Sequence, residues 1–186
     1  MSEAPGAAAT APLAHTLQDD DFTLFSLPRG FALDRAVLDE RWKALQRQVH
    51  PDRFAAQGAA AQRVAMQWSV RVNEAYNRLK DPLQRAAYWC ELQGVPVQAQ
   101  RNTAMPTDFL LQQMAWREAL EEAPAQADPA AALEALLDDA AADRRQRLAA
   151  LARLIDEQGD AAAAAQQVRA LMFVERFTED LHRRLD

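Results

Sequence analysis

A proline that follows an apolar helical stripe restricts the fold of this chain more than any other feature. Apolar residues recur ahead of it at i, i+4, i+7 and i+11, which is one face of an α-helix: Leu38, Trp42, Leu45 and Val49. Asp34 stands where a helix N-cap belongs. Pro51 cannot continue the hydrogen-bond ladder and disfavours helical backbone at His50. The sequence therefore predicts a helix over about residues 35–49, followed by a turn that displays His50 and Asp52.

A second apolar stripe begins about ten residues after this turn. Its residues again share one face of a helix: Ala65, Trp68, Val72, Ala75, Tyr76 and Leu79. We expect a helix over about residues 62–80 that packs back against the first, with a loop from His50 to about Ala60 between them. On the first helix, Lys43 and Arg47 lie one turn apart and away from the apolar stripe, so they form a basic strip that leads to the loop.

The residues at the end of the second helix complete a recognisable pattern with the His50–Asp52 tripeptide. They read Asn73-Glu74-Ala75-Tyr76, Leu79, Asp81-Pro82, Arg85-Ala86 and Tyr88. Together with the tripeptide they resemble the J-domain family over roughly residues 21–94. The resemblance implies an all-α domain, placed at 21–95, in which an antiparallel helix pair has short flanking helices and carries the tripeptide in its loop.

A J-domain implies a particular partner, a DnaK/HscA-type ATPase chaperone whose hydrolysis of ATP it stimulates without doing any chemistry itself. The matching contact positions in this chain are Arg41, Lys43, Arg47, His50, Pro51, Asp52 and Arg53. Arg53 stands where the family more often has lysine, which keeps the charge. Alternatively, a histidine in this position serves as a cap at the helix end and contacts no partner. The surrounding pattern favours the chaperone contact.

The rest of the chain predicts more helices and no strand. Residues 1–20 are rich in alanine and contain no lysine or arginine, so we expect a disordered tail in a cytoplasmic protein. Residues 96–107 contain two prolines and an asparagine and are predicted to be a linker. Over residues 108–186, helices of about 108–123, 130–158 and 161–185 are joined by short connections, which predicts an antiparallel three-helix bundle.

The helix at 108–123 has two apolar faces. Phe109, Trp116 and Leu120 fall within about 40° of one another on a helical wheel and form the expected core stripe. The second face holds further apolar residues beside two carboxylates: Leu110, Leu111, Met114, Glu118 and Glu122. Phe173 likewise lies off the core stripe of the last helix. An exposed apolar patch rimmed by charge indicates a partner site, but the wheel alone also allows these residues to be ordinary core.

A J-domain followed directly by an acidic helical bundle resembles the HscB family of co-chaperones in iron–sulfur cluster assembly. Residues 109–122 and 168–173 are similar to the first and last bundle helices of that family, which bind the cluster scaffold protein. The resemblance implies scaffold-binding positions at Leu110, Leu111, Met114, Glu118, Glu122 and Phe173. Ala115 departs from the family, in which a carboxylate can occur. An adaptor for a client unrelated to cluster assembly is the alternative.

Composition argues against several other functions. The net charge of -6 does not suit a nucleic-acid-binding protein, and no apolar run approaches the roughly 20 residues of a membrane span. His50, Asp52 and Cys90 contain the elements of a catalytic triad, but no oxyanion loop or phosphate-binding glycine loop accompanies them. The three histidines and the one cysteine of the chain lack the spacing of zinc ligands. We therefore expect no enzyme, no cofactor and no metal, with Cys90 an inert core thiol.

Overall fold

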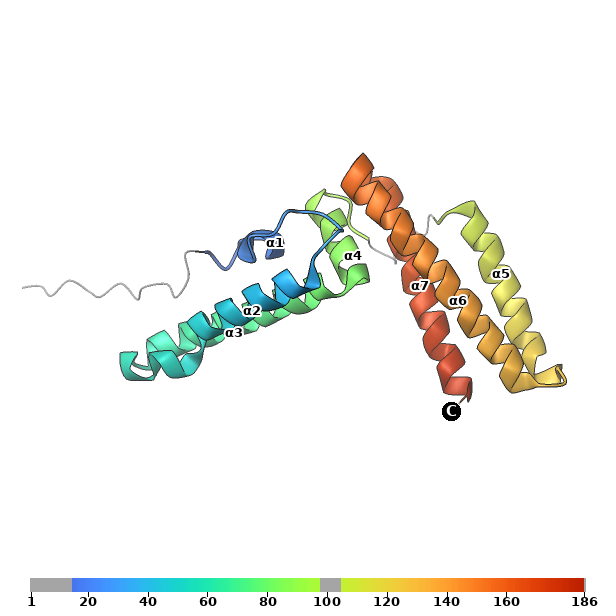
Figure 1. Ribbon diagram of the computed structural model, residues 1–186, viewed down its shortest axis with the longest axis horizontal. Coiled ribbons are helices and arrows are strands. Elements are labelled where there is room, and N and C mark those ends of the chain that lie inside the picture. The colour runs from blue at the N-terminus through green and yellow to red at the C-terminus, as the bar shows by residue number, and fades with distance from the viewer. Residues whose placement is uncertain (1–14, 98–104, 186) are drawn as a thin grey trace, which may run out of the picture. The chain divides into compact units, whose positions relative to one another are not determined.

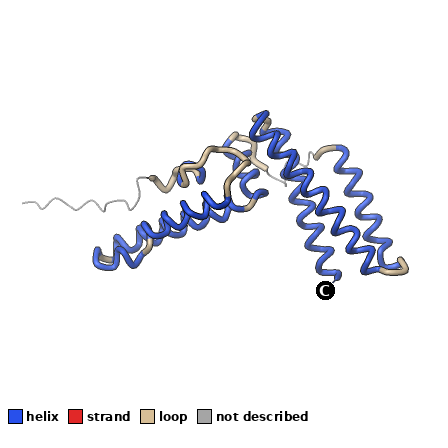
Figure 2. Tube along the Cα trace, viewed as in Figure 1, coloured by secondary structure: helices blue, strands red, loops and turns tan. Residues whose placement is uncertain are grey.

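The computed structural model describes residues 15–97 and 105–185 (Figure 1). Within these ranges the chain forms helices and loops without a strand (Figure 2). Contacts divide it into two compact units. The first holds the described residues up to Arg29 and Leu33–Asp81, and the second holds Gly30–Ala32 and the described residues from Pro82 onward.

The first unit is built on the two predicted amphipathic helices. α2 spans Arg35–Val49 and α3 spans Ala59–Lys80, and the two helices lie side by side (Figure 1). The side chain of Asp34 accepts hydrogen bonds from the backbone N–H groups of Ala36 and Val37, as its position as N-cap requires. The stripes bury the expected residues, among them Leu38, Val49, Trp68, Val72 and Leu79.

Polar contacts fix the register of this helix pair. The indole N–H of Trp42 and the amide of Gln46 both donate to Oδ1 of Asn73, at 3.0 and 2.6 Å. The ring of Trp42 stacks on that of Tyr76 with centroids 4.7 Å apart, and Arg35 donates to the Tyr76 hydroxyl at 2.8 Å. Contacts near both ends of α2 therefore hold it against α3.

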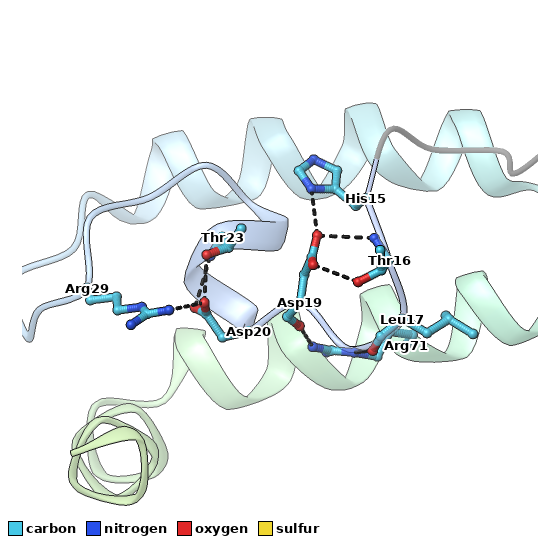
Figure 3. A network of polar contacts seen from close by, with 8 residues as sticks. All are labelled: His15, Thr16, Leu17, Asp19, Asp20, Thr23, Arg29 and Arg71. Atoms are coloured by element: carbon cyan, nitrogen blue, oxygen red, sulfur yellow. Dashed lines mark hydrogen bonds and ion pairs between the residues drawn. The ribbon is translucent and has the colours of Figure 1, made fainter. Parts of the chain in front are cut away.

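In the segment before α2, residues 15–29 are linked to one another and to α3 by polar contacts (Figure 3). The carboxylate of Asp20 caps the short helix α1, Asp21–Leu24, and pairs with Arg29 at 2.7 Å. Arg71 of α3 donates to the backbone carbonyl of Asp19 at 2.6 Å. The sequence predicted a disordered tail over residues 1–20. Of these, 15–20 instead form a segment held by hydrogen bonds, and the others lie outside the described residues.

Asp21 is a charged residue in the core of the first unit. It is fully buried, and its carboxylate pairs with Arg71 at 2.7 Å and with Arg78 at 3.2 Å. Because a buried charge is costly unless it is paired, these arginines are needed to hold α1 against α3.

In the second unit, α4, Pro82–Leu92, packs against α7, Ala161–Leu185. Ala86, Trp89 and Cys90 share one buried cluster with residues of α7 such as Val168 and Leu171. The sequence placed this helix inside a domain of 21–95. Its apolar side is instead buried with the helices of the C-terminal part, so the compact units divide at residue 81.

The bundle itself consists of α5, Thr107–Glu122, α6, Pro129–Ala152, and α7. The 3-10 turn η2, Ala123–Ala125, joins the first two, and the π-helical turn η3, Arg153–Gln158, extends α6. An aromatic cluster fills the core near α5: the rings of Trp116 and Phe177 stack with centroids 5.1 Å apart. Most of the predicted linker, 96–107, lies outside the described residues.

The three residues Gly30–Ala32 are tied into the second unit by its side chains. The carboxylate of Asp156 accepts hydrogen bonds from the backbone N–H groups of Phe31 and Ala32, at 2.6 and 2.8 Å. Arg85 donates to the Phe31 carbonyl at 2.9 Å, and its guanidinium lies 5.1 Å from the centre of the Phe31 ring. These contacts join residues more than 50 positions apart in the sequence.

Candidate binding surfaces

The His-Pro-Asp tripeptide lies at an exposed turn at the end of α2. Pro51 is the first residue of a 3-10 helix, η1, Pro51–Gln57, where the sequence suggested a loop. Proline suits this position because it has no backbone N–H, and an N–H there would have no partner within the helix. The backbone N–H of Asp52 donates to Nδ1 of His50 at 3.3 Å. The side chains of His50 and Asp52 are 56% and 91% exposed. His50 thus caps η1 through Nδ1, which also lies 3.5 Å from Oδ2 of Asp52, and both side chains remain exposed to solvent.

A basic strip leads along α2 to this turn. Lys43 and Arg47 are exposed and, with Trp42, Gln46 and Asn73, line a shallow hollow of about 410 Å³. The guanidinium of Arg53 donates to the Arg47 carbonyl at 3.0 Å, so η1 is tied to the last turn of α2. The fold thus gathers Lys43 and Arg47 with residues 50–53 at one end of the helix pair.

Arg41 has a different environment from the rest of the predicted chaperone-binding set. It is only partly exposed, and one guanidinium nitrogen donates to the backbone carbonyls of Phe25, at 2.6 Å, and of Ser26. These bonds hold the turn after α1 against α2. The structure therefore gives Arg41 a role within the fold, which the sequence did not predict.

Two exposed apolar side chains near the basic strip were missed by sequence reasoning. Met66 and Val70 of α3 are half exposed, at 54% and 50%. Met66 precedes Asn73, which lines the hollow beside Lys43, by two helical turns and so lies on the same side of α3. Their offset from the core stripe of α3 is the signal that could have identified them.

The second apolar face predicted on α5 is exposed in the second unit. Leu110, Leu111 and Met114 are 45%, 65% and 70% exposed, and Glu118 and Glu122 beside them are also exposed. The opposite face of the same helix is in the core, where Phe109 and Trp116 are buried. Within the second unit, the alternative that these side chains are ordinary core does not hold. We call Leu110, Leu111 and Met114 the α5 patch.

Phe173 lies between surface and core. It is partly buried, its ring meets the Phe109 ring edge to face at 5.7 Å between centroids, and it stacks on Phe177 at 6.2 Å. Phe173 therefore packs within the bundle and is still partly exposed.

Cys90 is buried, and this burial raises the pKa of its thiol to about 11, so it stays protonated at neutral pH. Within residues 15–97 and 105–185, no group of three or more histidine, cysteine or carboxylate side chains could hold a metal ion. None of the described helices combines the length and apolar character needed to cross a membrane.

Comparison with known proteins identifies the family of the chain. The sequence profile of the HSCB C-terminal oligomerisation domain matches residues 105–182. The chain is 54% identical over 166 residues to the "Co-chaperone protein HscB homolog" of Burkholderia thailandensis, covering 89% of this chain and 94% of the relative. The relative of the same name from Bordetella petrii is 53% identical over 163 residues, with 88% and 94% covered.

Two solved structures show the same fold. Chaperone HscB from Vibrio cholerae is 38% identical, with a TM-score of 0.74 over 89% of this chain and 96% of that one. The human co-chaperone HscB is 25% identical, with a TM-score of 0.82 over 98% and 94%. These likenesses confirm the predicted fold class, a J-domain followed by a helical bundle. From the relatives' identity and near full-length coverage, we conclude that this chain belongs to the HscB family of co-chaperones.

Proposed function

We propose that this chain binds an iron–sulfur cluster scaffold protein, delivers it to a DnaK/HscA-type chaperone and stimulates the ATPase of that chaperone. The observation that supports the proposal is the presence of two exposed surfaces on one chain, one in each compact unit. The His50–Asp52 turn belongs to the first unit and the α5 patch to the second. The chain acts in the cytoplasm, a reducing compartment that suits its single cysteine.

The first surface meets the chaperone. Lys43 and Arg47 face acidic groups of the partner, which steers the encounter and makes it sensitive to salt. The exposed carboxylate of Asp52 accepts charge-assisted hydrogen bonds from an arginine of the chaperone. Hydrolysis takes place on the chaperone's own ATP, so this chain acts only by favouring one state of its partner.

The second surface meets the scaffold protein. Leu111 and Met114 supply the apolar centre of the contact, and Glu118 and Glu122 supply its charged rim. The exposed edge of Phe173 extends it towards α7. Because apolar side chains this exposed are unusual when they gather on one helix face, the α5 patch supports a partner site.

The two contacts act together because they are on the same chain. A scaffold protein held by the second unit remains near any chaperone held by the first, so the second binding event takes place at a high effective concentration. Delivery therefore needs no contact between scaffold and chaperone before both are bound here.

A capture experiment with three forms of the chain tests this proposal. Immobilised wild-type chain in an extract of its own cells, with ATP present, is expected to retain both the scaffold protein and one DnaK/HscA-type chaperone. Asp52→Asn should lose only the chaperone, and Leu111→Ala with Met114→Ala should lose only the scaffold. Retention of the chaperone with an unrelated client, and no scaffold, would favour the alternative of an adaptor for another protein.

Self-association through the same patch is a second candidate, because the profile matched by residues 105–182 is described as an oligomerisation domain. Sedimentation of the purified chain distinguishes self-association from scaffold binding. If the α5 patch binds a second copy, wild type sediments as a dimer or larger and the Leu111→Ala, Met114→Ala variant as a monomer. If it binds the scaffold, both sediment alike.

A further inference from the structure

Arg147 is a nearly buried cation where the three helices of the bundle meet. Its side chain comes from α6, and only 8% of it is exposed. The guanidinium pairs with the carboxylate of Asp143, one turn earlier on the same helix, with Nε 2.7 Å from Oδ2 and Nη2 3.0 Å from Oδ1. Its other nitrogen, Nη1, donates to Oε1 of Gln167 on α7 at 2.9 Å. Groups from two helices therefore fix the plane of the guanidinium.

The same guanidinium reaches the third helix through an aromatic ring. Its central carbon lies over the Phe109 ring of α5, 4.1 Å from the ring centre. At this distance a cation is attracted to the face of the ring, and the attraction is stronger when both groups are shielded from water. Phe109 is fully buried. Arg147 thus links α5 to α6 and α7, although it lies in neither of the two exposed surfaces.

The beginning of α5 depends on this ring. No side chain among the described residues caps the N-terminus of α5, where Pro106 occupies the N-cap position. The buried residues of this helix are Phe109 and Trp116, and Trp116 comes about two turns later. The Phe109 ring is therefore the main anchor of the first turn of α5 in the bundle.

The position of the Phe109 ring sets the position of two proposed scaffold contacts. Leu111 follows Phe109 by two residues, so it points about 200° away from it within one turn of the helix. A rotation of α5 that moves the ring therefore moves Leu111 as well. Phe173 of α7 meets the same ring edge to face, at 5.7 Å between centroids. A group that holds this ring acts on both parts of the scaffold-binding surface.

From these contacts we infer that Arg147 is a positioning residue for scaffold binding: it fixes the Phe109 ring, and through that ring the α5 patch, without touching the scaffold protein itself. The inference rests on the proposed function and adds to it a residue outside the contact surface. The alternative is that Arg147 only neutralises the carboxylate of Asp143. The two accounts differ in where the bundle loosens when the guanidinium is removed.

Hydrogen exchange at single amides of the full chain measures this loosening. Arg147→Met keeps the length of the side chain and removes its charge and its donors. The amides of Leu111 and Met114 should then exchange at least about tenfold faster than in wild type, and that of Trp89 on α4 should change much less. Leu151→Ala is the matched control, because Leu151 is fully buried on α6 but packs in the cluster that contains Trp89. In this control Trp89 should change more than the α5 amides.

Two further variants distinguish the accounts. Arg147→Lys keeps a cation near the ring and should lie between wild type and Arg147→Met, and it supplies the same comparison if Arg147→Met does not fold. Arg147→Met with Asp143→Ala also removes the carboxylate that has lost its arginine, and fast exchange in α5 should persist. Wild-type exchange in this double variant, or equal acceleration in α4 and α5 of Arg147→Met, would overturn the inference.

The dissociation constant for purified scaffold protein, measured by calorimetry, connects the positioning to binding. Arg147→Met should raise it at least about fivefold at a temperature at which the chain is folded, and Leu151→Ala should leave it within about twofold. If Arg147→Met binds as wild type does, while Leu111→Ala with Met114→Ala weakens binding, the inference is wrong and the proposed function stands. If wild type does not bind the scaffold, the proposed function fails and the inference with it.

Discussion

The carboxylate of Asp156 accepts a hydrogen bond from the backbone N–H of Phe31 at 2.6 Å, across 125 positions of sequence. The neighbouring residue Gly30 leaves room for that carboxylate. A Cβ added at Gly30 would lie 2.7 Å from Oδ1 of Asp156, closer than van der Waals contact allows. The two hydrogen bonds at Phe31 and Ala32 hold the carboxylate, so it cannot turn away without losing them.

Gly30→Ala is therefore expected to lower the free energy of unfolding, by about 1–3 kcal/mol, because it displaces an acceptor of two backbone donors. Asp156→Ala should cost a similar amount. Combined, the two substitutions should cost clearly less than their sum, since the added methyl group then meets no carboxylate. Urea unfolding of wild type, the two single variants and the double variant measures these free energies. If the two single losses add up to the loss in the double variant, the clash does not exist.

The α5 patch predicts a separation between binding and stability. Leu111→Ala with Met114→Ala should weaken scaffold binding by up to a few kcal/mol and change the melting temperature little, because both side chains are mostly exposed. Phe109→Ala on the opposite face removes a fully buried ring and should cost about 3–5 kcal/mol of stability. Unfolding of the patch variant would show that its side chains support the fold.

Arg41 and Arg47 lie on the same helix and should respond oppositely to substitution. Arg41→Ala removes the donor to the Phe25 and Ser26 carbonyls and should lower the melting temperature. Arg47→Glu should leave melting unchanged and weaken the chaperone contact, more at low salt than at high salt. Arg47→Lys keeps the charge and is the control. A salt-independent loss in Arg47→Glu would contradict a steering role.

Cys90 predicts a pH dependence of stability at the alkaline end. Burial raises the pKa of its thiol from 9.0 to about 11, so the folded state favours the protonated form. The resulting stability is complete below pH 9 and is lost as pH rises towards 11. When the pH is raised from about 8 to about 10.5, the free energy of unfolding should fall more for wild type than for Cys90→Ala. Equal losses would assign the pH dependence to other groups.

Helix limits were predictable wherever local chemistry sets them. Asp34 and Pro51 bracket α2, and the predicted range 35–49 agrees with the observed Arg35–Val49. The phase of α6 was harder. In its first half Leu136 and Ala140 are buried, whereas Leu133 and Leu137 are only partly buried and Ala141 is exposed. Alanine and leucine occur all round this helix, so its sequence contains little information on which side faces the core.

The site was predictable to the extent that it is local. The His50–Asp52 turn and the α5 patch each occupy one short stretch, so the pattern of that stretch was sufficient to predict that they are exposed. The role of Arg41 depends on carbonyls 15 and 16 positions away, and the placement of Phe173 depends on the ring of Phe109, which comes from another helix. Only the packed structure brings such groups together.

Membership of a co-chaperone family agrees with the expectation that the chain is not an enzyme. On the proposed function its effect is measured on the partner chaperone, and we expect that effect to depend most on Asp52. The Asp52 side chain is 91% exposed, so we expect its substitution to leave the fold undisturbed.

The most direct test is the ATPase rate of the purified DnaK/HscA-type chaperone, in single turnover, with wild-type chain and with Asp52→Asn. Wild type should accelerate hydrolysis. With Asp52→Asn the hydrolysis rate should stay at that of the chaperone alone, and this variant should melt at the same temperature as wild type. Full stimulation by a folded Asp52→Asn chain would contradict the account.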